Sequence, residues 1–371
     1  MPARKSKDAT IAIVGAGPVG LTAAVELKRR GYSPRVLEKD KGPHVESRAL
    51  GINPRTLDIL SPSGAAQRLL AAGVKARAVN LHDPDGNTLF RFETRNIPHP
   101  AHAYMLVLPQ AETEKLLLET LGGRKTVEWN TEVTKLALKD GQPHLTLRKR
   151  GKTQTLSPDI VIGADGARST VRKSLGIGFA GEAYEHDWGI LDASIPGLPQ
   201  DELHIFDLSP LLIGFIPLRG DLFRVVADTP DVLEVLPDHL EMKEIVWQSR
   251  FRISHRLVET YRKGPVFLAG DAAHIHSPLG GRGMNLGIED AAWLAHLIDT
   301  GETGRYSSLR RPVAKKVLAE VDRATRFMAS DGAIATFLRR HLLPLVAGTR
   351  FVQKNALRTI AGLSTPAPPW L

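Results

Sequence analysis

The period of the hydrophobic pattern changes along the chain, and each change marks a predicted element. Residues 10–17 are a short run of β-branched apolar residues that ends in glycines, and residues 18–31 then show the spacing of an amphipathic helix. A second strand pattern follows over residues 33–40. Strand, helix and strand in this order predict a βαβ unit, and therefore an α/β fold with a parallel sheet.

The next part of the chain mixes helical and strand patterns. Residues 57–73 and 110–123 have helical spacing, and the second of these segments ends in two glycines. Residues 79–92 have a strand pattern around an Asp-Gly turn, and residues 126–166 alternate in short runs separated by turn residues. We predict a hairpin in the first case and a β-meander in the second.

Beyond Gly176 the chain changes to short strand-like runs separated by Pro, Gly and Asp, and a helical pattern follows over residues 231–246. We predict an antiparallel sheet with this helix packed against it. The strand-like runs are residues 187–195, 202–208, 211–218 and 222–228.

The last third of the chain returns to the α/β pattern. Residues 266–270 predict a strand, and a helix is expected to begin near Gly283. The pattern beyond Gly301 is helical, and the Pro-rich residues 364–371 predict a frayed tail.

Composition places the chain among folded soluble proteins. Of its 371 residues, 42% are hydrophobic and 24% are charged, and none is cysteine, so disulfides, thiolate metal sites and cysteine nucleophiles are excluded. The apolar stretch over residues 11–27 is interrupted by glycines and a proline, which argues against a membrane span. With no secretory signal at the N-terminus, we expect a cytoplasmic protein.

Positive charge is concentrated in one segment. Residues 305–358 contain 12 basic and 3 acidic residues, a net charge of +9 that equals the formal charge of the whole chain. One interpretation is a solvated helix face. The other is peripheral contact with an anionic surface such as phospholipid, because the segment mixes basic and large apolar residues. No nucleic-acid-binding motif accompanies this charge, so we expect no nucleic-acid partner.

A glycine-rich turn follows the first predicted strand. Gly15, Gly17 and Gly20 form G-x-G-x-x-G between this strand and a helix, and Glu38 ends the next strand. In such a turn the first glycine permits tight bending, the second admits a pyrophosphate, and the third lets the helix pack closely on the strand. The helix N-terminus supplies free N–H groups to the phosphates. We predict dinucleotide binding here, with Glu38 accepting hydrogen bonds from a ribose.

A second glycine-rich turn does not repeat this pattern. The stretch "VFLAGDAAHIHSPLGGRGMN" contains a strand, Gly270 and Asp271, a loop, and then Gly280, Gly281 and Gly283. An acid at a strand end can bind a polyol hydroxyl, and bare glycine backbone can lie against a flat ring. The helix predicted to follow would point its positive end at the same site.

Taken together, these motifs resemble those of the flavoprotein monooxygenases of the p-hydroxybenzoate hydroxylase fold, the single-component aromatic hydroxylases. The resemblance covers nearly the whole chain and rests on three motifs in order. They are the first turn with Glu38; Asp165, Gly166 and Arg168 in "VIGADGARSTVRK"; and Asp271, Pro278, Gly280, Gly281, Gly283, Met284 and Asn285 in the second turn.

The resemblance implies one extended FAD served by both turns. The first turn would hold the pyrophosphate, Glu38 would lie at the adenosine ribose, Asp271 would hold the ribityl chain, and the loop from Pro278 to Asn285 would flank the isoalloxazine. Lys39, next to Glu38, is also expected to bind the cofactor. Four further residues match family positions near FAD or the passing nicotinamide: Arg48, Arg55, Gln110 and Asp165, with Arg168 beside the last.

Three residues are implied to act closest to the chemistry: Arg48, Pro278 and Arg282. Family members commonly have Gln where this chain has Arg282. Its cation is expected either to stabilise anionic reduced flavin, or to face solvent or an acidic substrate.

The fold implied is an α/β one, with a Rossmann-like FAD-binding domain, an inserted mixed or antiparallel β-sheet substrate domain and a C-terminal helical segment. The FAD-binding domain is expected to comprise residues 1–79, 107–176 and 263–300. Residues 80–106 and 177–262 would form the substrate domain, and residues 301–371 the C-terminal helices and tail.

The activity implied is NAD(P)H- and O2-dependent hydroxylation of a phenolic, polyketide-like or quinone-precursor aromatic through a flavin C4a-hydroperoxide, by a monomer or homodimer, with NADPH or NADH as co-substrate. Two alternatives share the fold: an FAD-dependent isoprenoid or lipid reductase, and a flavin-free binding module of the escort-protein type. Flavin halogenases lack support because their tryptophan motif is not found.

Candidate substrate residues lie on the inserted sheet. Aromatic and histidine side chains there are candidates for the substrate wall, although aromatics that alternate on a strand are more often core. The wall candidates are Tyr184, Trp188, His204, Phe206, Phe215 and Phe223, and the candidate bases are Tyr104, Tyr184, His186 and His204. His274 and His276 lack a third ligand nearby, so we expect no metal and place them beside the flavin loop.

Overall fold

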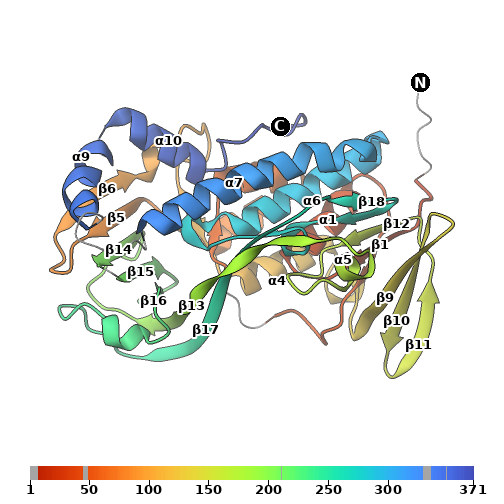
Figure 1. Cartoon of the computed structure of the whole chain (residues 1–371), viewed down its shortest axis with the longest axis horizontal. Helices are drawn as coiled ribbons and strands as arrows, with labels where there is room; N and C mark the ends of the chain where they lie inside the picture. Colours follow the sequence, from red (N-terminus) through yellow and green to blue (C-terminus); the bar gives the residue numbers. More distant parts are fainter. Residues whose placement is uncertain (1–6, 45–48, 210, 329–335, 348) are drawn as a thin grey trace.

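The computed structural model describes residues 7–44, 49–209, 211–328, 336–347 and 349–371 (Figure 1). An α/β layer lies beside a large twisted sheet, and helices near the C-terminus lie over one end of that sheet. Among the described residues, no helix combines the length and the apolar character that crossing a bilayer requires.

The α/β layer is built on a sheet with the strand order β18-β19-β12-β1-β2-β8. All neighbours in it are parallel except β18 and β19. The predicted βαβ unit is confirmed, because β1 and β2 pair in parallel on either side of α1. The strands are β1 Ile11–Val14, β2 Arg35–Leu37, β8 Val127–Glu128, β12 Ile160–Gly163, β18 Arg262–Lys263 and β19 Val266–Leu268.

Helices cover this sheet and form most of the core with it. Helix α1 packs against both α4 and α6, and α6 runs beside α7 (Figure 1). The helices expected over residues 110–123 and from Gly283 are confirmed as α4 and α6. The helices of this layer are α1 Pro18–Arg29, α2 Pro54–Leu60, α3 Ala65–Ala72, α4 Gln110–Leu121, α5 Thr170–Ser174, α6 Gly283–Thr300 and α7 Tyr306–Met328.

Two small sheets flank the layer. The meander predicted over residues 126–166 is confirmed for its middle part, the antiparallel sheet of β9 Thr131–Lys139, β10 Gln142–Lys149 and β11 Lys152–Leu156, whereas β8 and β12 at its ends belong to the parallel sheet. The second sheet consists of β3 Gly51–Ile52, β7 Met105–Val107 and β4 Val74–Ala76, and it lies next to the large sheet through apolar contacts.

The large sheet has the order β20-β17-β13-β16-β15-β14-β5-β6. The hairpin predicted over residues 79–92 is confirmed as β5 and β6, and β5 pairs in parallel with β14. The strands are β5 Ala78–His82, β6 Thr88–Glu93, β13 Phe179–Ser194, β14 Glu202–Leu208, β15 Leu211–Pro217, β16 Leu222–Ala227, β17 Ile245–Val258 and β20 His274–Ile275.

Three expectations about local structure are wrong. Residues 231–246 form only a short 3-10 turn at Val232–Val235, because Pro237 interrupts the segment and residues from Ile245 onward pair with β13. The helix expected over residues 57–73 is divided by a turn in which Gly64 has φ 78°. The tail is packed rather than frayed, since the Trp370 ring lies 5.1 Å from that of Trp293.

The C-terminal helices lie on the side of the large sheet that faces the α/β layer. Leu357 of α10 packs with Phe92 of β6 and with Ile97, and α9 contacts β6 (Figure 1). These elements are a π-helical turn at Leu338–Leu342, α9 Leu343–Ala347 and α10 Arg350–Ile360.

Candidate active site

Three sequence motifs far apart in the chain meet at the carboxyl ends of β1, β12 and β19. These strands are neighbours in the sheet, so the turns that follow them are adjacent. A Cβ on Gly15 would overlap the Ala164 carbonyl, which precedes Asp165, and a Cβ on Gly270 would lie 2.7 Å from Val19 Cγ2 at the start of α1. Ligands of α/β sheets bind at this edge.

The three glycines of the first turn have the geometry that a pyrophosphate site needs. Gly15 has φ 104°, and a Cβ on Gly20 would overlap the Gly15 carbonyl oxygen, so both positions exclude a side chain. A Cβ on Gly17 would meet only Glu114 Oε1, at 4.0 Å. No side chain caps α1 at Gly17, and its first N–H groups therefore remain available to phosphate oxygens.

Glu38 lies at the end of β2 and is held in place by backbone donors. Its two carboxylate oxygens accept hydrogen bonds from the N–H of Ala16 at 2.7 Å and of Asp40 at 3.0 Å. Each oxygen retains a further lone pair that can accept from a ribose hydroxyl. The neighbouring Lys39 is exposed.

The Asp-Gly motif places one partly buried acid next to the first turn. Asp165 accepts from the Ser169 hydroxyl and from the Val171 N–H at 3.1 Å, and it thereby fixes the start of α5. Burial raises the pKa of the Asp165 carboxyl above its ordinary value. Arg168, by contrast, is exposed.

The second glycine turn joins the loop before α6 to β3. The Asn285 amide donates to the Gly51 carbonyl at 2.8 Å and to the Gly281 carbonyl at 2.6 Å. Its oxygen accepts from the Asn53 N–H at 2.9 Å. Helix α6 begins at Gly283 with no side-chain cap, so its positive end is free to face a ligand.

The remaining residues of this loop offer a mostly bare surface. Pro278 and Gly280 are exposed, Met284 packs partly against the main core, and Asp271 is exposed in the turn after β19. Backbone of this kind, bordered by an uncapped helix, fits a planar ring that carries negative charge when reduced.

Arg282 and Arg55 are both buried against the C-terminal segment. The Arg282 guanidinium donates to the Thr359 carbonyl, and burial lowers its pKa. Only 3% of Arg282 is exposed, so the alternative in which it faces solvent is wrong. The backbone N–H of Arg55 donates to the Ala361 carbonyl at 3.3 Å. Arg48 lies outside the described residues.

Two buried polar groupings near the turns were not predicted from the sequence. In the first, His274 and Asp290 share a 2.7 Å hydrogen bond, and Arg310 of α7 donates to Asp290 at 2.7 Å and to Glu289 at 2.5 Å. The grouping ties the segment after Asp271 to α6 and α7. These hydrogen bonds join residues 16 to 21 positions apart, and no local pattern connects them.

The second grouping lies beside Gly17. Gln110 donates to Glu114 Oε1 at 2.9 Å, and His44 Nδ1 lies 3.0 Å from Glu114 Oε2. Glu114 is fully buried, and its hydrogen bond and charge raise the pKa of His44 to about 8. Gln110, expected near the cofactor, thus lies next to the phosphate-binding turn through Glu114.

The large sheet has two faces that differ in exposure, and strand register assigns residues to each. The inner face carries Leu203, Ile205, Gly214, Ile216 and Val226, and it packs on residues of the small β3-β7-β4 sheet. The outer face carries Phe206, Phe215 and Phe223, which are 0–1% exposed and pack beneath Val232, Leu236 and Leu240.

The expectation that Phe206, Phe215 and Phe223 line the substrate wall is therefore wrong. They form a closed core on the face directed away from the α/β layer. The segment that covers this outer face was expected to be a helix, but it is irregular apart from the 3-10 turn at Val232–Val235. Apolar side chains on the inner face remain partly exposed.

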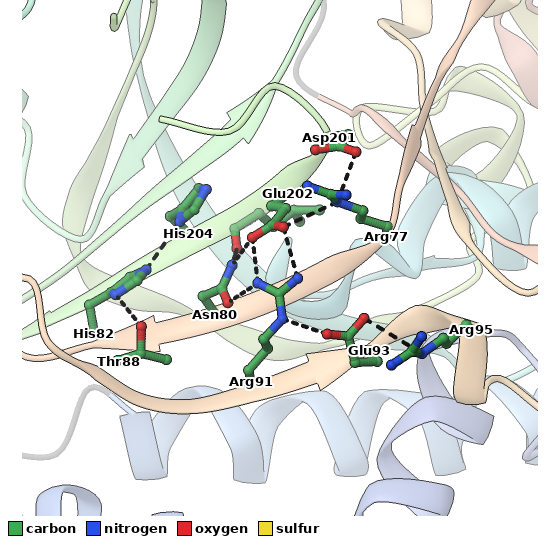
Figure 2. Close-up of polar contacts among 11 residues, drawn as sticks. Arg77, Asn80, His82, Thr88, Arg91, Glu93, Arg95, Asp201, Glu202 and His204 are labelled. Carbon is green, nitrogen blue, oxygen red and sulfur yellow. Dashed lines mark hydrogen bonds and ion pairs between the residues drawn. The ribbon is translucent and has the colours of Figure 1, made fainter. Parts of the chain in front are cut away.

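His204 also lies on the outer face, within a polar network that ties β5, β6 and β14 together (Figure 2). Its Nδ1 lies 3.1 Å from His82 Nε2, and burial lowers the pKa of His204 to about 4. Glu202 accepts from both Arg91 and Asn80, and Arg91 holds the pKa of Glu202 near 2. His204 is structural here, and its candidacy as a wall residue or base is corrected.

The other candidates have different positions. The Tyr184 hydroxyl donates to Asp322 of α7 at 2.7 Å, and burial raises its pKa. The Tyr104 hydroxyl lies 3.0 Å from His102 Nδ1. Trp188 is on the inner face, 7% exposed, with its ring 6.4 Å from that of Phe251. The His186 side chain lies outside the described part of the chain.

Near the middle of the inner face, the sheet leaves room for a ligand. A Cβ added to Gly214 would have only backbone atoms within 4 Å, both at 3.9 Å. Farther along this face Arg224 makes a bidentate pair with Asp192, both contacts 2.7 Å, and its guanidinium lies 5.2 Å from the Trp247 ring centre. The inner face is thus largely apolar with one neutralised ion pair.

The fold and the turns define a class of protein. An extended dinucleotide with a planar ring fits the two glycine turns at the sheet edge, Glu38 at the end of β2 and the uncapped N-terminus of α6. The large sheet lies on the side of the α/β layer where the ring would bind. This arrangement is that of an FAD-binding flavoprotein with a p-hydroxybenzoate hydroxylase-like fold.

Comparison with known proteins identifies the family. The family model described as "FAD binding domain" matches residues 8–209 and 229–321, and the chain belongs to this family. It is 34% identical over 346 residues to pentachlorophenol 4-monooxygenase of Sphingobium chlorophenolicum, covering 85% of this chain and 64% of that protein. It is 34% identical over 390 residues to 6-methylpretetramide 4-monooxygenase of Streptomyces rimosus, covering 95% and 68%.

Solved structures show the same fold. That of p-nitrophenol 4-monooxygenase from Pseudomonas putida DLL-E4 has a TM-score of 0.83 at 23% identity and covers 95% of this chain and 98% of that one. That of an anhydrotetracycline hydroxylase from Streptomyces rimosus has a TM-score of 0.80 at 28% identity, covering 97% and 77%. The chain spans about two thirds of the length of the curated relatives cited here.

Proposed function

We propose that this protein is an NAD(P)H- and O2-dependent FAD monooxygenase that hydroxylates an aromatic compound at the inner face of the large sheet. One observation carries the proposal: a partly exposed apolar face, open above Gly214, adjoins the small sheet whose Gly51 contacts the flavin loop. The names of relatives that act on pentachlorophenol and 6-methylpretetramide support an aromatic substrate.

FAD, when bound, supplies the redox and oxygen-transfer chemistry. The chain would hold its pyrophosphate at Gly15, Gly17 and Gly20, its adenosine ribose at Glu38 and its ribityl chain at Asp271. The uncapped N-terminus of α6 would stabilise negative charge on the reduced ring. The loop from Pro278 to Asn285 would border the ring.

The inner face would orient the substrate and exclude water. Ile205, Ile216 and Val226 offer apolar contact to a ring, and exclusion of water strengthens every polar interaction at the reacting centre. The Arg224–Asp192 pair would favour a phenolic or quinone-like oxygen at one edge, since a neutralised arginine can still donate a hydrogen bond. A phenolic, polyketide-like or quinone-precursor aromatic fits these groups.

The test measures nicotinamide oxidation and incorporation of isotopically labelled O2 across a panel of phenols and polycyclic aromatics, with NADH and NADPH compared. Substrate-dependent oxidation with one labelled oxygen in the product is expected. Gly214→Leu should fill the inner face and raise the substrate KM at least roughly tenfold while FAD remains bound. Gly178→Leu, an exposed position with nothing within 4 Å, is the matched control. Reduction of a double bond without labelled product would instead identify a reductase.

We further propose that the basic C-terminal helices contact an anionic surface. Residues 332–371 contain no Asp or Glu, and Phe337, Leu345 and Phe351 are 61%, 73% and 76% exposed. Basic helices with exposed apolar side chains bind anionic bilayers. Co-sedimentation with phosphatidylglycerol vesicles but not phosphatidylcholine vesicles is expected, and its loss in Leu345→Glu/Phe351→Glu would support this surface. Equal binding to both vesicles, or none, would overturn it.

A further inference from the structure

A carboxylate borders the place where the first turn leaves room for phosphate. Glu114 of α4 is fully buried, and its Oε1 lies 4.0 Å from the position of a Cβ on Gly17. A pyrophosphate at this turn carries negative charge, and two unscreened negative charges a few ångströms apart repel each other strongly. Binding there requires a cation that offsets Glu114.

His44 is positioned to be this cation. Its Nδ1 lies 3.0 Å from Glu114 Oε2 and its backbone N–H donates to the same oxygen at 3.4 Å. Gln110 donates to the other oxygen but is neutral. About half of the His44 side chain is exposed, and in the described part of the chain its Nε2 forms an ion pair with Asp40 Oδ2 at 3.5 Å, a distance long enough for this nitrogen to donate to an incoming oxygen instead.

The charges around His44 favour its protonated form. Glu114 faces it from α4, while Glu38 and Asp40 face it from the end of β2. One cation in this region is Arg124, whose guanidinium packs over Gly42 and donates to the Lys41 carbonyl. The carboxylates dominate, and they raise the pKa of His44 to about 8.

We propose that His44 is a cofactor-binding residue, whose imidazolium offsets the Glu114 carboxylate beside Gly17 and donates from Nε2 to the pyrophosphate of FAD. The inference rests on FAD binding at the first turn and adds a residue outside the three motifs. FAD affinity then depends on pH. Below pH 8 His44 is charged and the cofactor is held, and as pH rises above 8 the charge is lost, leaving Glu114 to repel the phosphates.

The experiment measures the Kd of the apoprotein for FAD by flavin fluorescence between pH 6.5 and 9.5. For the unaltered protein we expect affinity to fall about tenfold across a midpoint at or above pH 8, since one charged hydrogen bond is at stake. His44→Gln should bind about tenfold more weakly at pH 7 with a flat profile. His44→Lys should bind tightly with a flat profile, because lysine stays charged throughout this range.

Two further variants make the outcome specific. His144→Gln makes the same change at a partly exposed histidine on β10, where Nδ1 contacts Ser157, and it should match the unaltered protein. Glu114→Gln removes the repulsion, so His44→Gln in that background should cost less than about threefold in affinity. Circular dichroism of each apoprotein verifies that the fold is retained.

The outcomes separate this inference from the assignment of the cofactor. If the unaltered protein fails to bind FAD at any pH, the cofactor assignment itself fails. If FAD binds but His44→Gln matches the unaltered protein at pH 7 and keeps its pH profile, only the role of His44 is overturned. Equal losses in His44→Gln and His44→Lys would also overturn it, because a merely structural role would not be rescued by charge.

Discussion

The side-chain amide of Asn285 donates to the main-chain carbonyl of Gly51 across 2.8 Å, and this contact joins the first turn of α6 to a strand 234 residues earlier in the chain. The same amide donates to Gly281 and accepts from Asn53, so one side chain satisfies three backbone groups. A buried asparagine therefore fastens the loop that would border the flavin ring both to itself, at Gly281, and to residues 51–53.

Replacing this asparagine should loosen the loop without unfolding the protein. In Asn285→Ala one buried and two partly buried backbone groups lose their partner, which costs about 1–3 kcal/mol. In Asn285→Asp the carboxylate can still accept from Asn53, but it faces two carbonyl oxygens. We expect both variants to melt at lower temperature and release FAD faster, Asn285→Asp more so at pH 8. Thermal melts and the appearance of free flavin fluorescence measure this, and unchanged release in both would contradict it.

Gly17 and Gly20 should respond to alanine in opposite ways. A Cβ on Gly20 would overlap the Gly15 carbonyl, so Gly20→Ala is expected to destabilise the apoprotein by about 2 kcal/mol or more. A Cβ on Gly17 has no protein atom nearer than 4.0 Å and would occupy phosphate space. Gly17→Ala should therefore keep apoprotein stability within about 0.5 kcal/mol and lose FAD affinity. Urea unfolding of the apoproteins and FAD titration distinguish the two, and equal stability losses would count against this geometry.

Arg310 is expected to matter for stability far more than an exposed arginine does. It is 1% exposed and neutralises both Asp290 and Glu289, so Arg310→Leu removes the arginine partner of two buried carboxylates. Breaking a buried pair in this way costs about 3–5 kcal/mol. Arg305→Leu is the control, because Arg305 pairs with Glu302 at the surface, where such pairs contribute little. A similar urea midpoint for both variants would refute the prediction.

Much of the fold was predictable because it depends on local sequence. The strand, turn and helix around Gly15, Gly17 and Gly20 follow from short-range pattern and glycine geometry, and the family resemblance linked this turn to the one before α6. The partners of Arg282 and Arg310 were not predictable, since these contacts span 77 and 20 residues respectively and no periodic pattern encodes them.

The hydrophobic pattern does not predict which face of the large sheet forms the substrate wall. Alternation along single strands could not show that Phe206, Phe215 and Phe223 share one face while Trp188 lies on the other, and it could not say which face would turn toward the α/β layer. That choice depends on the irregular segment after Asp228, which covers the outer face with Val232, Leu236 and Leu240. The inner face therefore includes aliphatic residues such as Ile205 and Val226.

The two histidines and the glutamate of the network on β5, β6 and β14 predict a stepwise loss of stability in acid. Burial lowers the pKa of His204 to about 4 from an ordinary value of 6.5, so the folded state favours neutral His204. Its contribution is complete above pH 6.5 and is lost as pH falls toward 4. Glu202, with its pKa lowered to about 2 from 4.5, contributes above pH 4.5 and loses this contribution as pH falls toward 2.

These two windows can be separated by substitution. His204→Gln should flatten the dependence of the free energy of unfolding on pH between 6.5 and 4, a change of about 1–3 kcal/mol, and leave the lower window intact. Glu202→Gln should leave the upper window intact and reduce the loss below pH 4.5 by about 1–2 kcal/mol, a value discounted because Arg91 is partly exposed. Urea unfolding at half-unit pH intervals measures both, with His144→Gln as the control. If His204→Gln retained the full slope between pH 6.5 and 4, that slope would have to arise from another buried group, such as His276, whose pKa burial also lowers to about 4.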